Sequence, residues 1–151
     1  MRVLVSTKQA VEEAVDRSRY DTNSEGALFT NNSVVAILGL IEEAYAGDDI
    51  SGYAVDHIYP KNKSREINEA VGDEVDLNRI GNLQLLPQGA NEKKSDQLPK
   101  DWLYNIGESS SSRVKEINLY PDVEPEKENA IEFIEQREQM ITDYLLQKYV
   151  E

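Results

Sequence analysis

The chain lacks cysteine altogether, has a single histidine, and is poor in basic residues for its length of 151 residues. Without cysteine there can be no disulfide bond, no thiolate nucleophile and no cysteine-ligated zinc, and one imidazole cannot build a histidine-rich metal site. A bound metal should therefore have mostly oxygen ligands. Sixteen Lys and Arg against twenty-nine Asp and Glu give a formal net charge of -13, which argues against binding of polyanions by bulk charge.

Long hydrophobic runs are also missing. The longest apolar stretch, residues 34–41, is far shorter than the roughly 20 residues that cross a bilayer. The apolar residues 3–5 give way to polar residues at 6–8, before a secretory segment of about 7 to 15 residues could form. We therefore expect a cytoplasmic protein without membrane association, folded as one domain over residues 1–151.

Helical periodicity is clearest near the two ends of the chain. Apolar spacing predicts a helix over residues 8–18 and a second over 34–46, which would begin after the Asn31–Ser33 cap and end at Gly47. A long amphipathic helix is predicted after Pro125 and should pack on the second helix. Its apolar stripe contains Ile131, Ile134, Ile141 and Leu145.

The middle of the chain has a different pattern. Two short strands are predicted at residues 53–55 and 82–86, with a weak helical signal between them around residues 67–71. A helix should start at Asn91 and stop at Pro99. Residues 108–113 and 120–125 are predicted to be surface loops.

Charge is distributed unevenly along the chain. Residues 53–104 hold seven basic and nine acidic residues, a net charge of -2, whereas the flanking segments 1–52 and 105–151 hold -5 and -6. The middle segment is therefore where a phosphate backbone would meet the least repulsion.

The residues with chemical potential lie in this segment. His57 follows Asp56 at the end of the first predicted strand; Asn82 begins the second, and Asn91 and Lys94 follow. Each of them alone has an ordinary structural explanation: a hydrogen-bonded histidine, turn or cap asparagines, and a solvated lysine. Their joint order and spacing are what favour a functional site.

This order resembles a known family. Asp-His-Ile, then Asn-Leu-x-Leu-Leu, then Asn-x-x-Lys-Ser are similar to the ββα-metal core of the HNH, or His-Me finger, nucleases, and the asparagine and lysine spacings resemble those of the HNH domain in the RNA-guided CRISPR nuclease. The His57–Pro60 motif and the closing helix with Arg137 resemble the C-terminal nuclease domain of GmrSD-type restriction enzymes, which attack modified phage DNA.

The resemblance implies an α+β fold with a metal-dependent DNA endonuclease activity. The ββα-metal core, a short two-stranded antiparallel sheet and a helix, would occupy residues 53–104, and helices from 1–52 and 105–151 would pack around it. Restriction or anti-phage defence is the implied setting. Related domains follow an N-terminal nucleotide-hydrolysing, DNA-recognising module, but the chain has no Gly-rich phosphate loop of that kind, so such a module is an expected partner besides the DNA substrate.

Elementary chemistry suggests a role for each residue. A neutral imidazole takes a proton from water at neutral pH, which makes His57 the candidate general base. Asp56 and Asn91 offer the oxygen ligands that suit Mg²⁺ or Mn²⁺, and Lys94, one helical turn after Asn91, is the candidate phosphate contact. The resemblance implies that Asn82 tethers the loop that orients His57.

Two features complicate this interpretation. Adjacent strand residues point to opposite faces, so Asp56 and His57 can share a site only if the strand ends or bulges there. The connection from His57 to Asn82 is also longer than in compact HNH motifs, and we interpret its acidic part, residues 72–76, as a surface insertion.

Two other functions are alternatives to the nuclease. A catalytically silent HNH-like module that binds nucleic acid or protein is the alternative, favoured by the net charge of -13. A serine hydrolase using Ser109–Ser112 is disfavoured because the chain has no Gly-x-Ser-x-Gly elbow.

Overall fold

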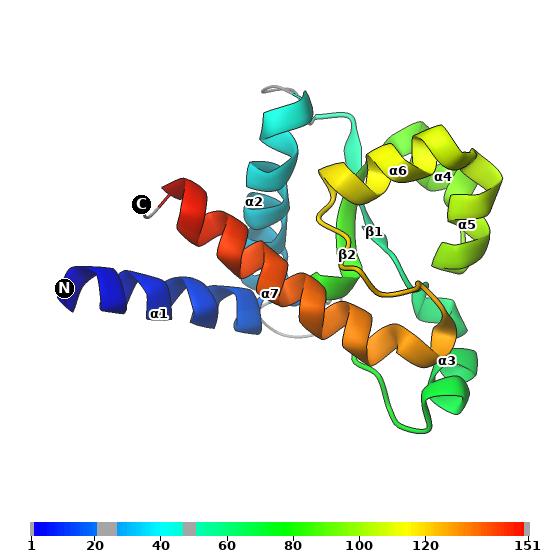
Figure 1. Cartoon of the computed structure of the whole chain (residues 1–151), viewed down its shortest axis with the longest axis horizontal. Coiled ribbons are helices and arrows are strands. Elements are labelled where there is room, and N and C mark those ends of the chain that lie inside the picture. Colours follow the sequence, from blue (N-terminus) through cyan, green and yellow to red (C-terminus); the bar gives the residue numbers. More distant parts are fainter. Residues whose placement is uncertain (1, 21–26, 47–50, 150–151) are drawn as a thin grey trace.

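The computed structural model describes residues 2–20, 27–46 and 51–149. A two-stranded antiparallel sheet lies in the middle of the molecule and helices surround it, as Figure 1 shows. This arrangement confirms the α+β class expected from the sequence. In chain order the elements are α1 (Arg2–Arg17), α2 (Ala27–Ala46), β1 (Tyr53–His57), η1 (Lys61–Lys63), α3 (Ser64–Val71), η2 (Ile80–Asn82), β2 (Leu83–Pro87), α4 (Gln88–Lys94), α5 (Pro99–Ile106), α6 (Glu108–Ile117), η3 (Lys127–Asn129) and α7 (Ala130–Tyr149).

Strands β1 and β2 form an antiparallel pair that is regular along its whole length. We call this pair the hairpin, although residues 58–82 connect the two strands. Pairing runs without a bulge from Tyr53 to His57, with Asp56 opposite Gln84 and His57 opposite Leu83. Directly opposed residues of an antiparallel pair share one face, and successive residues of a strand alternate between faces. The side chains of Asp56 and His57 therefore leave the hairpin on opposite faces.

Two apolar clusters form the core, and β2 contributes to both. Leu86 belongs to the first cluster, whereas Leu83 and Leu85 belong to the second. The first cluster contains Ile58, Tyr59, Ile67, Val75, Leu77, Leu86, Trp102, Leu103, Tyr120, Ala130, Phe133 and Ile134. The second contains Val15, Val34, Ile37, Leu38, Ile41, Ile80, Leu83, Leu85, Ile141 and Leu145.

Helix α7 connects the two clusters. Phe133 and Ile134 in its first half join the first cluster, and Ile141 and Leu145 in its second half join the second. The most extensive contacts of α7 are with η2 and with α1, which runs beside it in Figure 1. The predicted packing on α2 is therefore a smaller part of its environment, made through the shared second cluster.

The first two helices begin earlier than the sequence predicts. Helix α1 starts at Arg2 instead of residue 8, and α2 starts at Ala27 instead of following a cap at Asn31–Ser33. Residues such as Asn and Ser cost a helix at most about 0.7 kcal/mol each relative to Ala, so a helix can continue through them. Helix α2 ends at Ala46 as predicted, and the expected cap Gly47 lies outside the described residues.

Three predictions between residues 88 and 117 are wrong. Asn91 lies inside α4 rather than at its start, and α4 ends at Lys94. Pro99 opens α5 instead of stopping a helix, because a proline in the first turn removes an N–H group that would be unpaired anyway. The serine-rich stretch from Glu108 is part of α6 rather than a loop, and Ser111 is buried in it.

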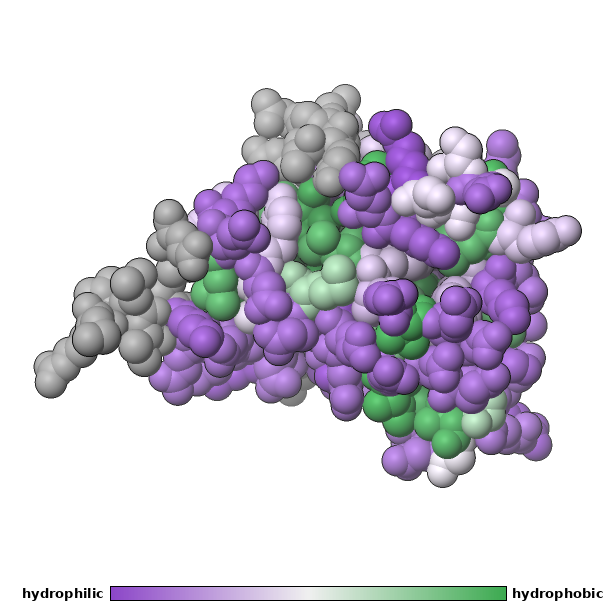
Figure 2. Space-filling model, viewed as in Figure 1, coloured by the Kyte–Doolittle hydropathy of each residue, from purple (hydrophilic) through white to green (hydrophobic). Residues whose placement is uncertain are grey.

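The visible surface is mostly polar. Figure 2 shows a largely hydrophilic face, with apolar side chains visible in the gaps between helices. Of the helices that the structure describes, none combines the length and the apolar character that a membrane crossing requires.

Candidate active site

On one face of the hairpin, Asp56 forms a buried ion pair with Lys94. Nζ of Lys94 lies 3.2 Å from Oδ2 of Asp56, and the two side chains are 0% and 6% exposed. Gln84 donates a hydrogen bond of 2.9 Å to the same oxygen and accepts one of 2.8 Å from the hydroxyl of Tyr120. Among the described residues no hydrogen bond reaches Oδ1 of Asp56. One carboxylate oxygen is therefore available to another ligand.

Lys94 is held from three directions. Besides its ion pair, Nζ donates a hydrogen bond of 2.9 Å to the backbone carbonyl of His57 and lies 5.7 Å from the ring centre of Trp102. Burial lowers the pKa of Lys94 and raises the pKa of Asp56, while their mutual attraction opposes both shifts. In this structure the ammonium of Lys94 joins α4 to β1 and does not reach solvent. The phosphate contact predicted for Lys94 stays a prediction.

Asn82 ties together the backbone around the site. Its buried side chain accepts a hydrogen bond of 2.8 Å from the N–H of Tyr59 and donates bonds of 3.0 and 2.8 Å to the carbonyls of Tyr59 and Leu77. These bonds fix the segment after β1 against the segment before η2. This geometry is compatible with the loop-positioning role that the resemblance implies for Asn82.

His57 lies on the other face of the hairpin and has different neighbours. Its Nε2 lies 3.0 Å from Oδ1 of Asn78, and its ring meets the ring of Tyr20 edge to face with the centres 6.1 Å apart. Because a carbonyl oxygen faces Nε2, that nitrogen carries the hydrogen and Nδ1 is left to accept a proton. Burial lowers the pKa of His57 against the opposing effects of Asn78 and Asp56, so the imidazole is neutral at pH 7.

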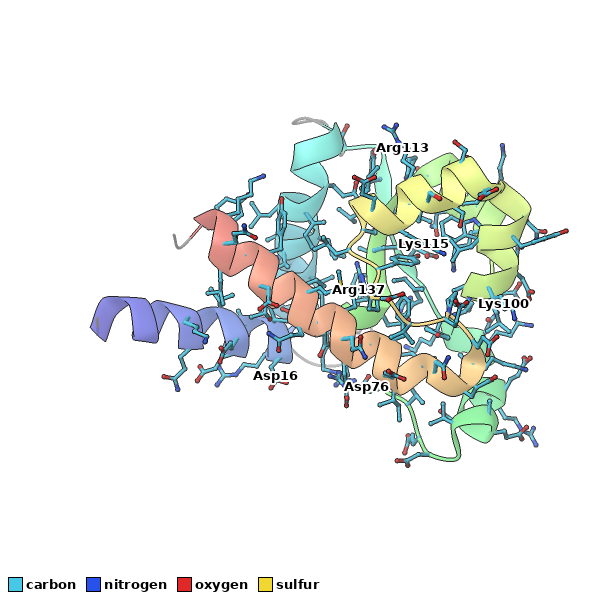
Figure 3. The ribbon with its side chains drawn as sticks, viewed as in Figure 1. Asp16, Asp76, Lys100, Arg113, Lys115 and Arg137 are labelled. Atoms are coloured by element: carbon cyan, nitrogen blue, oxygen red, sulfur yellow. The ribbon has the colours of Figure 1, made fainter. Side chains whose placement is uncertain are left out.

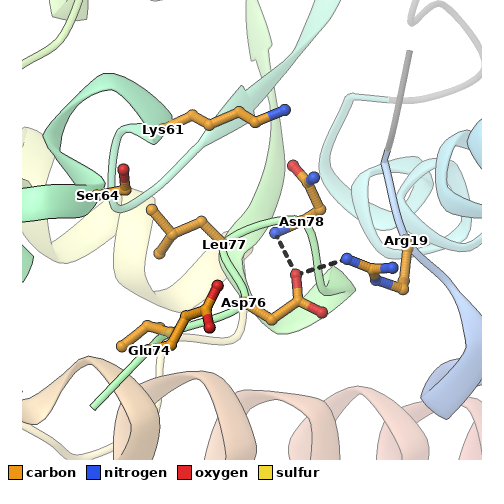
Figure 4. A pocket seen from close by; sticks show the side chains of 8 residues that line it. Arg19, Lys61, Ser64, Glu74, Asp76, Leu77 and Asn78 are labelled. Atoms are coloured by element: carbon orange, nitrogen blue, oxygen red, sulfur yellow. Dashed lines mark hydrogen bonds and ion pairs between the residues drawn. The ribbon is translucent and has the colours of Figure 1, made fainter. Parts of the chain in front are cut away.

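Asn78 also lines a cleft of about 440 Å³, which we call the His57 cleft because Asn78 contacts Nε2 of His57; His57 itself is not one of the residues that line it. Figure 4 shows Lys61 reaching across it toward Asn78, with Glu74 at the opposite end. The lining is formed by Arg19, Lys61, Ser64, Glu74, Val75, Asp76, Leu77 and Asn78. The cleft thus joins the chain after α1, the start of α3 and the segment before η2.

Arg19 lines this cleft, and backbone hydrogen bonds hold residues 18–20 against the segment before η2. The N–H of Tyr20 donates a hydrogen bond of 2.8 Å to the carbonyl of Asn78, and the N–H of Ile80 donates one of 3.1 Å to the carbonyl of Ser18. The guanidinium of Arg19 lies 2.8 Å from Asp76. The N-terminal part of the chain therefore helps to position Asn78, and with it the imidazole of His57.

The connection between His57 and Asn82 is not a plain surface insertion. Val75 and Leu77 are buried in the first core cluster, and the neighbouring Asp76 accepts a hydrogen bond of 3.1 Å from the N–H of Asn78. The prediction of a surface insertion at residues 72–76 is therefore wrong for Val75. The segment is anchored by apolar packing and forms part of the His57 cleft.

Arg137 extends from α7 toward the sheet, as Figure 3 shows. Its guanidinium is fully buried and donates hydrogen bonds of 2.6 to 3.1 Å to the backbone carbonyls of Asn118, Ile80, Gly81 and Leu83. Burial lowers the pKa of Arg137 to about 10, so it remains charged at pH 7. Arg137 thus fixes η2, the turn that contains Asn82 and leads into β2.

The donor set for a metal is small. No three His, Asp or Glu side chains of the described residues gather in one place. Asn91 is half-buried in α4, one turn before Lys94, and its amide has no hydrogen-bond partner among the residues that the structure describes. The amide of Asn91 and Oδ1 of Asp56 are oxygen donors, the kind that suits Mg²⁺ or Mn²⁺. The residues therefore fit the predicted type of ion.

Several residues around the site were missed by sequence reasoning. Gln84 carried a signal, since a single polar side chain among leucines in a strand indicates a buried polar partner. Asn78 lies in a polar connection where asparagine is common, so its contact with His57 could not be foreseen. Arg19 is far in sequence from any motif, and Lys61 follows the His57–Pro60 motif but is one of several lysines in a polar stretch, so neither contact with the cleft could be foreseen.

The chain was compared with known proteins. Residues 9–144 match the family model described as "GmrSD restriction endonucleases, C-terminal domain". Neither a curated protein nor a solved structure is significantly similar to it. The family match covers most of the chain, including the hairpin, the His57 cleft and most of α7, and it confirms the resemblance inferred from the sequence motifs. The chain therefore belongs to the family of GmrSD restriction endonuclease C-terminal domains.

Proposed function

We propose that the chain is a metal-dependent endonuclease domain of the HNH type that hydrolyses phosphodiester bonds in DNA. Membership in a restriction endonuclease family supports a nuclease role. The observation that carries the finer proposal is the placement of His57. Its neutral imidazole is held at Nε2 by Asn78, whose side chain also lines a cleft large enough for part of a nucleotide.

In this proposal His57 is the general base. Proton transfer to a well-placed base contributes roughly 10² to 10⁴ to a reaction rate. Asn82 keeps the backbone after His57 in place, and Lys94 neutralises Asp56 while holding the carbonyl of His57. The catalytic geometry thus depends on a rigid hairpin rather than on a mobile loop.

Asp56 and Asn91 would hold the divalent cation, Mg²⁺ or Mn²⁺. Because Asp56 and His57 leave β1 on opposite faces, the proposal requires the end of β1 at His57 to twist or open so that the imidazole and the carboxylate serve one site. When bound, such an ion supplies positive charge beside a phosphate that becomes more negative as the reaction proceeds. The free Oδ1 of Asp56 and the unpaired amide of Asn91 support this assignment. A hard ion that keeps most of its water shell needs no more than a few protein ligands.

Restriction of foreign DNA in the cytoplasm is the proposed setting, with an N-terminal nucleotide-hydrolysing and DNA-recognising module as partner. The chain's net charge of -13 supports such an arrangement, because an acidic nuclease domain gains little affinity for DNA from bulk charge. A separate module would then supply most of the binding and the choice of target.

A catalytically silent binding module is the second candidate. The closed ion pair between Asp56 and Lys94 favours it, since a metal ligand that is already neutralised by a buried lysine has less need of a cation.

One assay separates the two candidates. Supercoiled plasmid is incubated with the chain in EDTA, and then with Mg²⁺ or Mn²⁺, using wild type and His57→Ala. The nuclease proposal predicts nicking only with the metal, and its loss in His57→Ala with unchanged circular dichroism. Identical behaviour of the two proteins would exclude His57 as the base, and DNA binding without cleavage would favour the silent module.

A further inference from the structure

The His57 cleft contains two basic and two acidic side chains, and they differ in how far they are already paired. Arg19 is bound to Asp76 at 2.8 Å, and the same carboxylate oxygen accepts the N–H of Asn78. Arg19 is thus part of the wall. Lys61 has no ion-pair or hydrogen-bond partner among the residues that the structure describes, and its side chain is exposed.

Lys61 also shares the cleft with Asn78, which contacts the imidazole of His57. Its charge contributes to lowering the pKa of His57, together with burial. Figure 4 places the ammonium end of Lys61 above the side chain of Asn78, which is the residue that contacts Nε2 of His57. A group bound by Lys61 would therefore lie near Asn78, the residue that contacts the proposed base.

We infer that Lys61 binds a phosphate of the DNA backbone in the His57 cleft and so holds the substrate beside His57. The inference rests on the proposed nuclease function and deepens it by assigning the substrate contact to a residue outside the HNH motif. A lysine ammonium is a common point contact for phosphate oxygens.

The charges around Lys61 favour this assignment over the alternatives. In a chain of net charge -13, a phosphodiester is attracted only where a cation is not already neutralised. Lys94 is 0% exposed and paired with Asp56, and Arg19 is paired with Asp76. Glu74 lies at the other end of the cleft in Figure 4, so the phosphate would approach from the side of Lys61.

The chain provides a matched control two residues away. Lys61 and Lys63 lie in the same turn, η1, but Lys63 does not line the cleft. Lys61→Met and Lys63→Met therefore remove the same charge from nearly the same place in the sequence. Lys61→Arg retains the charge and serves as the conservative variant.

The first measurement is binding of a fluorescein-labelled DNA duplex in EDTA, followed by anisotropy over a range of salt concentrations. Losing one phosphate contact reduces the slope of log K against log salt by about 0.9 for duplex DNA. We expect Lys61→Met to lose this amount and to weaken binding about tenfold. Lys63→Met and Lys61→Arg should stay close to wild type, and equal effects of Lys61→Met and Lys63→Met would overturn the inference.

The second measurement is the plasmid-nicking rate as a function of DNA concentration with Mg²⁺. Lys61→Met should raise KM with a smaller effect on kcat, because it removes binding and leaves the base in place. If His57→Ala abolishes nicking while Lys61→Met equals Lys63→Met, the inference fails and the nuclease proposal stands. If the chain never nicks but binds DNA through Lys61, the nuclease proposal fails alone; if it binds no DNA, both fail.

Discussion

Asp56 and His57 are neighbours on β1, but their side chains lie in two unlike regions of the molecule. The Asp56 side is closed: a buried lysine, a glutamine and a tyrosine surround the carboxylate. On the His57 side, Asn78, which contacts the imidazole, lines a cleft of about 440 Å³ together with mostly polar residues. The two strands thus separate a side on which Asp56 is buried and paired from a side on which a cleft is open to solvent.

The difference between the two sides suggests a division of tasks. Side chains of the closed side satisfy buried backbone and polar groups, so their loss should reduce the free energy of unfolding. Side chains of the open side are partly exposed, so their loss should alter DNA binding or cleavage with little effect on stability. The following substitutions test this division.

The largest effect on stability is expected for Lys94→Met. It leaves Asp56 as a buried charge without its cation, and breaking a buried pair in this way costs about 3 to 5 kcal/mol. Urea unfolding measures this loss. The exposed neighbour Lys93 is the matched control, and Lys93→Met should change stability by less than about 0.5 kcal/mol. Equal stability of the two variants would contradict a closed Asp56 side.

Gly81→Ala should have the next largest effect. A Cβ at Gly81 would collide with the backbone carbonyl of Ile134 and with the side chain of Glu138, so α7 would have to move away from η2. Overpacking of this kind typically costs about 1 to 3 kcal/mol.

Gly89 provides the control for that substitution. A Cβ at Gly89, within α4, meets nothing within 4 Å. Gly89→Ala should therefore be neutral or stabilise by up to about 1 kcal/mol, because alanine loses less conformational entropy in a helix. The melting temperatures of both variants measure the two effects. A Gly81→Ala protein as stable as wild type would contradict the close packing of α7 against Gly81.

Glu42, on α2, is a second buried carboxylate to compare with Asp56, and it allows a smaller and pH-dependent test. One of its carboxyl oxygens is buried without a partner among the described residues, and burial raises its pKa to about 7 against the attraction of Arg137. Arg113 lines the same cavity as Glu42. The folded state therefore keeps a proton that the unfolded chain releases near pH 4.5.

The sign of the effect follows from this proton. Because the folded state binds it more tightly, the contribution of Glu42 to stability is greatest below about pH 4.5 and is lost as pH rises to about 7. Glu42→Gln cannot titrate, so it should be more stable than wild type at pH 8 and show a flatter dependence on pH. Urea unfolding at pH 5 and pH 8 measures the difference, and parallel curves for the two proteins would rule out a buried, titrating Glu42.

The sequence alone predicted the parts of the fold that depend on local pattern. The strands around Val55 and Leu85 alternate or run apolar, and α7 has a clear amphipathic stripe. Helix ends were predicted less well, because Asn91 can start a helix or lie inside one, and Pro99 can open a helix or follow its end. Their positions are decided by the packing of α4 on the hairpin and by the first core cluster.

The candidate site also has a part that could be predicted from the sequence and a part that could not. His57, Asp56 and Lys94 were found from their order and spacing in the chain. The contact between His57 and Asn78, and the approach of residue 19 to the cleft, depend on how distant segments pack. Charge pattern could not show that Lys94 would be buried while Lys61 remained exposed, since both are lysines in similar polar surroundings.

The most direct test compares His57→Ala with wild type in two measurements on the same protein preparation. One is the rate of plasmid nicking with Mg²⁺, and the other is the free energy of unfolding in urea. We predict that nicking falls by roughly 10² to 10⁴ while stability changes by less than about 1 kcal/mol. Unchanged nicking, or a loss of stability as large as that expected for Lys94→Met, would contradict an open catalytic side at His57.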